Sequence, residues 1–194
     1  MAEDKTNYTP APEENLLGLT DKNLINEEEL MGIGNAEYFI FNLDENVKIS
    51  TSLILELHKI SFGKMYDWAG KWRNINVIVG QLTPPEPSKI VNLMYQFIDE
   101  LNYKISLAKT KEEHVEALAY GHYEFIRIHP FNNGNGRTGR LLMNLIALKF
   151  GYRFIDLYYR EGEQRTIYIN AMKDADKGNF ETLKKLIERE LTFR

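Results

Sequence analysis

The sequence predicts a mostly α-helical domain that carries one short β-hairpin. Apolar residues return every three or four positions through most of the chain, which is the period of a helix with one buried face. Only one segment shows the alternation that is typical of a strand. The chain has 194 residues, of which 43% are hydrophobic, so it can build one core but hardly two.

The N-terminal part is predicted to be a tail followed by a helix. Residues 1–15 hold two prolines and several charges but no apolar period, so we expect a flexible tail ahead of a domain at 16–194. Asn26 and Glu29 have the spacing of an N-terminal capping box. The pair predicts that the first helix begins near residue 26.

The next elements are a helix and then the hairpin. The apolar spacing from Leu53 predicts a helix that ends near Gly63. Ile75, Val77 and Val79 then stand on alternate positions, and a glycine and three prolines follow. This pattern predicts a strand that turns into a hairpin or flap.

The rest of the chain is predicted to be helical. Helical spacing returns in the segments 90–107, 112–127, 141–148 and 180–191. Gly151 can adopt the left-handed conformation that ends the third of these helices. No internal repeat or low-complexity block interrupts them.

Composition excludes several classes of function. The net charge is −4 with a pI near 5.7, so the chain has no basic surface to neutralise a nucleic acid. It has no cysteine, which excludes disulfides, thiolate metal sites and a cysteine nucleophile. No stretch is apolar enough for a signal peptide or a membrane span, so we expect a cytoplasmic protein without a membrane or nucleic-acid partner.

The segment from His129 to Arg140, HPFNNGNGRTGR, concentrates the chemistry. Gly134, Asn135 and Gly136 allow the backbone to approach an anion, and the helix that follows offers unpaired amides and its positive dipole end. Arg137 and Arg140 lie on one side of that helix and can grip phosphate oxygens. His129 can take a proton from a hydroxyl, and its unperturbed pKa suits this near neutral pH. The segment predicts transfer from a nucleotide.

Two other interpretations compete with this one. Gly134, Gly136 and Gly139 match the G-x-G-x-x-G pattern of dinucleotide-binding oxidoreductases, with Asp156 at about the ribose-binding distance. Five residues that include a proline separate these glycines from any strand ending at Ile128, and the chain lacks repeated strand–helix units. The remaining histidines are interpreted as structural, because a lone histidine is usually packed or capping; they are His58, His114 and His122.

His129 to Arg140 resembles the signature of the Fic family: histidine, proline, phenylalanine, any residue, an acid, glycine, asparagine, glycine, arginine, two residues and arginine. The similarity extends over about 25–191, since His58 to Pro87 resembles the family's flap region and Tyr168 to Asn179 its later helix and turn. The resemblance implies a Fic-type helical bundle that transfers AMP from ATP to a Ser, Thr or Tyr hydroxyl of a target protein.

The family's site residues are implied position by position. His129 would be the general base, and the motif from Asn133 to Arg140 would bind the phosphates. The resemblance further implies that the flap near residues 77–85 covers the nucleotide and docks the target. The residues implied for nucleotide binding are Asn133, Gly134, Asn135, Gly136, Arg137, Thr138, Gly139, Arg140, Val79, Gly80, Gln81, Leu82, Tyr168 and Asp176.

Asn133 departs from the family pattern, because AMP-transferring members usually carry Asp or Glu there to hold magnesium. A neutral amide oxygen should bind Mg²⁺ more weakly and rely on the phosphates of ATP. A pseudoenzyme or toxin-like binding protein is therefore an alternative, whereas Gly136 stands where the phosphotransferase branch has lysine. The family's inhibitory-helix pattern is not met, with Thr9 to Glu13 closest. We therefore expect either an unrestrained enzyme or one that is held by a separate small antitoxin-like protein.

Overall fold

The computed structural model describes residues 14–79, 83–157, 159 and 161–193. The described part is built from helices, in the order α1 (Lys22–Phe41), α2 (Thr51–Phe62), a 3₁₀ turn (Pro87–Lys89), α3 (Ile90–Leu107), α4 (Lys111–Ile128), α5 (Asn135–Lys149), α6 (Gly162–Ala175) and α7 (Glu181–Glu190). The predicted helical class is confirmed. No ladder of strands is formed among the described residues, apart from a bridge between Tyr152 and Phe193.

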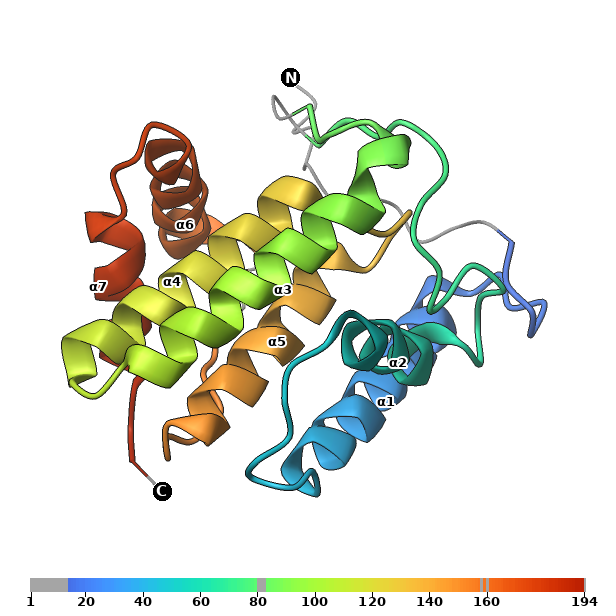
Figure 1. Ribbon diagram of the computed structural model, residues 1–194. Helices are drawn as coiled ribbons and strands as arrows, with labels where there is room; N and C mark the ends of the chain where they lie inside the picture. Colours follow the sequence, from blue (N-terminus) through green and yellow to red (C-terminus); the bar gives the residue numbers. More distant parts are fainter. Residues whose placement is uncertain (1–13, 80–82, 158, 160, 194) are drawn as a thin grey trace.

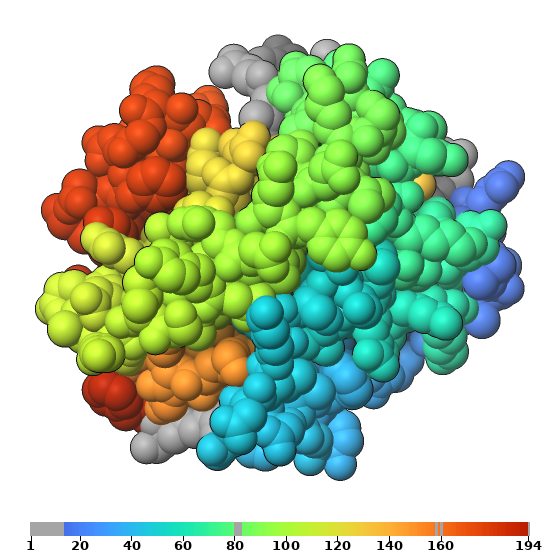
Figure 2. All heavy atoms as spheres, viewed as in Figure 1, coloured from blue at the N-terminus to red at the C-terminus, as the bar shows by residue number. Residues whose placement is uncertain are grey.

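Helix α5 is the centre of the molecule. It is contacted by α1, α2 and α4, and its residues 141–147 are all buried. The pair α1 and α2 lies on one side of α5, and α6 and α7 lie on the other side of α4 (Figure 1). Helix α3 covers α4, and its surface crosses the face seen in Figure 2 between the N-terminal and the C-terminal helices.

Most helix boundaries follow from local signals. Helix α4 begins with a capping box in which Thr110 and Glu113 bond each other's backbone amides. Helix α3 spans the predicted segment 90–107, and α2 ends at Gly63 as expected. Gly151, just after α5, has a φ of 81°, which is the left-handed conformation that its position predicted.

The predicted start of the first helix was wrong. Helix α1 begins at Lys22, and the Asp21 carboxylate caps it by accepting hydrogen bonds from the amides of Asn23 and Leu24. Asn26 and Glu29 therefore lie inside the helix. Glu29 is only 5% exposed, so its carboxylate faces the interior rather than a helix end.

The connection from α2 to α3 is the segment for which the hairpin was predicted, and the hairpin stays a prediction. Its described parts, residues 74–79 and 83–86, contain no helix, while Gly80, Gln81 and Leu82 lie outside the described residues. We refer to the described residues 74–79 and 83–86 as the flap segment. Of the predicted tail, residues 1–13 also lie outside the described part, and Leu16 already bonds the Met65 carbonyl through its amide.

Candidate active site

His129 ends α4 in an unusual backbone conformation. Its φ and ψ are 51° and 60°, and it is the one described non-glycine residue with a positive φ. This left-handed turn takes the chain out of the helix and into the loop that precedes α5. The ring Nδ1 lies 3.3 Å from the Ile126 carbonyl oxygen. Because a carbonyl can only accept, Nδ1 carries the hydrogen and Nε2 keeps its lone pair.

The pKa of His129 is lowered to about 4, mainly because the ring is buried. The Ile126 carbonyl opposes this shift, and the positive charge of Arg73 adds to it. The expectation of an unperturbed pKa was therefore wrong. At neutral pH the ring is uncharged, which is the form that accepts a proton.

The loop between His129 and α5 is closed on itself by one side chain. The Asn135 amide accepts a hydrogen bond from the Phe131 amide at 2.9 Å and donates one to the Phe131 carbonyl at 2.8 Å. Gly134 has a φ of 76°, and a Cβ there would stand 2.6 Å from the Phe62 ring. Only glycine fits this turn, because both its backbone angle and its neighbour exclude a side chain.

The first turn of α5 offers free backbone donors. The first helical hydrogen bond of α5 is donated by the Thr138 amide to the Gly134 carbonyl at 2.9 Å. The amides of Asn135, Gly136 and Arg137 bond no residue of the described ranges. Together with the positive end of the helix dipole, these three donors have the chemistry to bind an anion. The Asn135 side chain, in contrast, is used up in bracing the loop.

The two motif arginines have different surroundings. Arg137 pairs with the buried carboxylate of Glu29 on α1, and its guanidinium lies 4.5 Å above the Phe62 ring. Glu29 also accepts a hydrogen bond from the Tyr66 hydroxyl at 2.9 Å. Arg140 extends over Gly136, where a Cβ would meet its Nη1 at 3.7 Å. Arg140 therefore stands beside the free amides.

Both arginines border a cavity of about 500 Å³ between α1, α5 and the segment 154–156. Its walls carry three further acids, Glu29, Glu37 and Asp156. Burial and the nearby Asp156 raise the pKa of Glu37. The cavity thus has apolar walls, and it also has acidic and basic side chains close to the free amides of α5.

Asn133 is turned toward its own loop. Its side-chain oxygen accepts a hydrogen bond from the Gly134 amide at 2.7 Å. Its carbonyl lies 3.1 Å from His58 Nε2, while His58 Nδ1 accepts from the Gly70 amide. The Gly70 donor fixes the hydrogen of His58 on Nε2, so the ring donates to Asn133. His58, interpreted as structural, thereby holds the motif loop.

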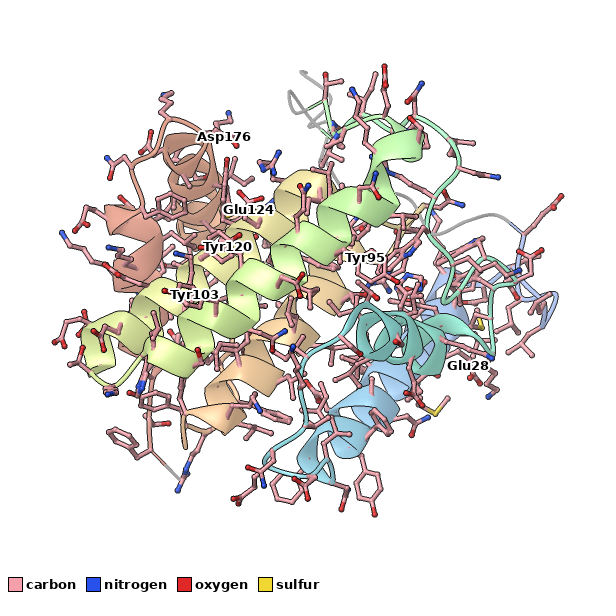
Figure 3. All side chains as sticks on the ribbon, viewed as in Figure 1. Glu28, Tyr95, Tyr103, Tyr120, Glu124 and Asp176 are labelled. Carbon is pink, nitrogen blue, oxygen red and sulfur yellow. The ribbon has the colours of Figure 1, made fainter. Side chains whose placement is uncertain are left out.

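The predicted nucleotide-binding residues outside the loop lie in several places. Val79 is the last residue of the first described part of the flap segment, residues 74–79. Tyr168 on α6 bonds His122 Nε2 at 2.8 Å and is close enough to Arg140 for that charge to act on its pKa. Asp176 lies at the C-terminal end of α6, on the opposite side of Figure 3 from α1, and accepts a hydrogen bond from Tyr123 at 2.9 Å.

Thr138 and Gly139 are buried between α4 and α5. The Thr138 hydroxyl donates to the Gly134 carbonyl at 3.0 Å, and a Cβ at Gly139 would meet Phe125 and Ile126 at 3.2 Å. These two residues shape the start of α5. His114, the last of the histidines interpreted as structural, stacks on Phe150 and bonds the Tyr152 hydroxyl.

Sequence reasoning missed Glu29 and Arg73. Glu29 was interpreted as part of a cap, and its partner Arg137 is 108 residues away, so no local pattern could have shown the pair. Arg73 is 2% exposed and donates to the His129 carbonyl at 2.7 Å. The sequence contained one signal for it, since Phe62 to Arg73 is part of the resemblance to a known family.

The fold and site define a helical protein in which an uncharged histidine ends one helix and unbonded amides begin the next. The chain belongs to the Fic/DOC family, whose sequence profile matches residues 48–147. The segment before the motif glycines is helix α4, not a strand, which removes the dinucleotide-binding alternative.

Relatives and solved structures agree with this assignment. The chain is 32% identical over 176 residues to the protein adenylyltransferase Fic of Drosophila willistoni and 29% identical over 173 residues to that of Nematostella vectensis. These matches cover 90% and 87% of this chain but only 34% and 39% of the relatives, so the chain spans about a third of their length.

Two solved structures have similar folds. BepC from Bartonella tribocorum, solved with bound AMPPNP, matches with a TM-score of 0.76 and 20% identity over 96% of both chains. Fic-1 (residues 134–508) from C. elegans matches with a TM-score of 0.72 and 26% identity, over 89% of this chain and 50% of that one. None of the helices in the described ranges is both long and apolar enough to cross a bilayer.

Proposed function

We propose that this chain is a protein adenylyltransferase, which moves AMP from ATP to a hydroxyl group of a target protein. The observation that carries the proposal is the pairing of two features in one short loop. His129 has a free Nε2 lone pair on an uncharged ring, and the start of α5 has three unbonded amides. A base and an anion site in one short loop suit the attack of a hydroxyl on a phosphate. The relatives named protein adenylyltransferase support this choice.

The proposed reaction is a single displacement at the α-phosphorus of ATP. His129 Nε2 takes the proton of the target hydroxyl while its oxygen attacks the α-phosphorus. The new oxygen–phosphorus bond forms as the bond from the α-phosphorus to the bridging oxygen breaks, and pyrophosphate leaves with that electron pair. The amides of Asn135, Gly136 and Arg137 stabilise the charge that develops on the phosphoryl oxygens.

The motif arginines would hold the outer phosphates. Arg140, which lies beside Gly136, is within reach of a diphosphate on the free amides. Arg137 would contribute only after its bond to Glu29 weakens. Tyr168, next to Arg140, is proposed to border the adenosine, while the same role for Asp176 stays a prediction.

The flap segment is proposed to receive the target. Its described parts contain no helix, Val79 takes part in a β-bridge, and Ile78 is 80% exposed. An extended target segment could pair with such an edge and bring its hydroxyl to His129.

A resident magnesium site does not fit the residues present. Within the described ranges no three His, Asp or Glu side chains gather around a common point. The amide oxygen of Asn133 is neutral and already accepts the Gly134 amide. We therefore propose that any Mg²⁺ arrives with ATP, held by phosphate oxygens and water, with Asn133 as a weak ligand at most.

A binding protein with little turnover is the second candidate. Two observations favour it, namely the neutral Asn133 and the engagement of Arg137 by Glu29. The cavity between α1 and α5 could take side chains of a small inhibitory antitoxin, because it combines apolar walls with Arg137 and Arg140. A cytoplasmic location also stays a prediction.

Transfer from ATP labelled at the α-phosphate, compared with ATP labelled at the γ-phosphate, tests the proposal. Wild type should transfer the α-label to proteins of a cell lysate, and His129→Ala should lose roughly 10²- to 10⁴-fold of that activity. Transfer of the γ-label would indicate a phosphotransferase. ATP binding with neither label transferred would favour the binding protein.

A further inference from the structure

Arg73 is a buried cation whose three guanidinium nitrogens all donate to backbone carbonyls. Nε donates to the His129 carbonyl at 2.7 Å, Nη1 donates to the Ile75 carbonyl at 2.9 Å, and Nη2 donates to the Pro85 carbonyl. A longer contact joins Nη2 to the Ile128 carbonyl at 3.5 Å. The Arg73 amide itself donates to the Pro130 carbonyl at 2.9 Å. One residue thus connects the end of α4 to both ends of the flap segment.

The guanidinium has no ionic partner within the described ranges, although its residue is 2% exposed. A buried charge is costly unless its hydrogen bonds are satisfied and an opposite charge is near. The end of α4 supplies part of this compensation, because the last carbonyls of a helix lack helical partners and carry the negative end of the dipole. The rigid five-donor fork of arginine can reach several carbonyls at once, which a lysine cannot.

Arg73 contacts His129 where the backbone has its left-handed conformation. A left-handed conformation at a non-glycine residue has to be imposed by its surroundings. The carbonyl of His129 points out of the helix and is held by Arg73 Nε. The neighbouring Pro130 carbonyl is held by the Arg73 amide. Arg73 therefore grips the backbone on both sides of the bend.

We propose that Arg73 is a positioning residue that sets the orientation of His129 and the placement of the flap segment together. The inference rests on the proposed function, in which the flap segment presents the target hydroxyl to His129. A target segment that pairs with the flap would then be aligned with the base through Ile75, Pro85 and the guanidinium between them. Loss of the fork would leave the anion site intact but misalign base and hydroxyl.

The test compares Arg73→Lys and Arg73→Ala with wild type. ATP affinity should stay within about two-fold, because Arg73 touches neither the free amides nor the motif arginines. The rate of AMP transfer at saturating ATP should fall by roughly 10²-fold in Arg73→Ala, the cost of misplacing reacting groups by about 1 Å. Guanidinium ion added at low concentration should restore part of this rate in Arg73→Ala and none in Arg73→Lys.

Arg127→Ala is the matched control. Arg127 is the second-last residue of α4, close to the same helix end, but its guanidinium pairs with Glu124 of the same helix. This variant should keep the wild-type rate. Full activity of Arg73→Lys would overturn the proposal, since one ammonium group cannot bridge the three segments. If Arg73→Ala fails to fold, Arg73→Lys alone decides, and a wild-type rate or a parallel loss of ATP binding counts against the inference.

Amide hydrogen exchange separates this inference from the proposed function. Exchange at the described ends of the flap segment and at residues 128–131 should rise together in Arg73→Ala and fall again with guanidinium ion. A wild type that transfers no label refutes the proposed function. The exchange experiment still tests whether Arg73 couples the flap segment to residues 128–131, because it does not depend on AMP transfer. Faster exchange in only one of the two regions would overturn the coupling.

Discussion

Glu29 on α1 and Arg137 on α5 form an ion pair that joins the N-terminal helix to the first turn after the motif loop. The carboxylate is buried and is held on its other side by the Tyr66 hydroxyl. The pair therefore ties one of the two phosphate-binding candidates to the scaffold. It links the stability of the α1–α5 contact to the availability of Arg137.

Replacing Glu29 with glutamine should lower stability and release Arg137. The amide keeps an oxygen for Tyr66 but loses its charge, so we expect a loss of about 1–3 kcal/mol in the free energy of unfolding. The freed guanidinium should tighten ATP binding several-fold. Urea titration and a fluorescent ATP analogue measure the two effects.

Glu28→Gln is the control for this prediction. Glu28 (Figure 3) precedes Glu29 and pairs with Lys64 at 2.6 Å, but Lys64 is 65% exposed. Such a surface pair contributes about 0–1 kcal/mol, so stability and ATP affinity should stay near wild type. Equal effects of the two substitutions would contradict the special role of Glu29.

The pH dependence of AMP transfer should follow the lowered pKa of His129. Only the uncharged ring accepts a proton, so activity should be present above the folded pKa of about 4 and disappear as the pH falls through it. The midpoint is best measured by NMR titration of the His129 ring alongside label incorporation at each pH. A loss of activity centred near pH 6.5, the ordinary pKa of histidine, would show that the His129 ring is more exposed to solvent than in this structure.

Two motif glycines should respond differently to alanine. Gly134→Ala places a Cβ 2.6 Å from the Phe62 ring at a φ of 76°, so it should destabilise the fold by about 1–3 kcal/mol. Gly136→Ala meets no protein atom closer than Arg140 Nη1 at 3.7 Å, so the fold should be retained. The added methyl group stands beside the free amides and should weaken ATP binding. Thermal unfolding and ATP titration separate the two, and normal ATP affinity of Gly136→Ala would remove this residue from the anion site.

Asn133→Asp should increase AMP transfer at limiting magnesium. Aspartate can still accept the Gly134 amide, and its second oxygen adds the charged ligand that the loop lacks. The label assay at several magnesium concentrations, with His129→Ala as the inactive background, measures the gain. An inactive Asn133→Asp beside an active wild type would indicate that the asparagine is adapted to another donor.

Local sequence patterns predicted the helices and turns that are determined by interactions between residues close in sequence. Helix α3 matches its apolar period, α2 ends near Gly63 as predicted, and Gly151 has the left-handed conformation that its position predicted. The motif loop was recognisable because its glycines, histidine and arginines are contiguous. Asp21 was missed as the cap because Asn26 and Glu29 offered a box of equal quality.

Long-range contacts could not be predicted in this way. The Glu29–Arg137 pair joins segments that are 108 residues apart, and Arg73 reaches the carbonyls of Ile128 and His129 across more than 50 residues. The burial that lowers the pKa of His129 likewise depends on the folded chain. The energies of these interactions depend on distances that only the folded chain defines. The same holds for His58, whose ring is stacked on Phe131 at 3.6 Å and bonded to Asn133 across 75 residues.

The left-handed backbone of residue 129 also limits which amino acids can replace the histidine without distorting the bend. Asparagine and aspartate adopt this conformation several-fold more readily than most residues, whereas a β-branched side chain there is strongly disfavoured. Alanine removes the base and also makes the turn less favourable, so its inactivity has two causes. His129→Asn removes the base, while asparagine still adopts the left-handed backbone conformation of the bend. It is therefore the better starting point for an inert form of the protein that still captures nucleotide and target.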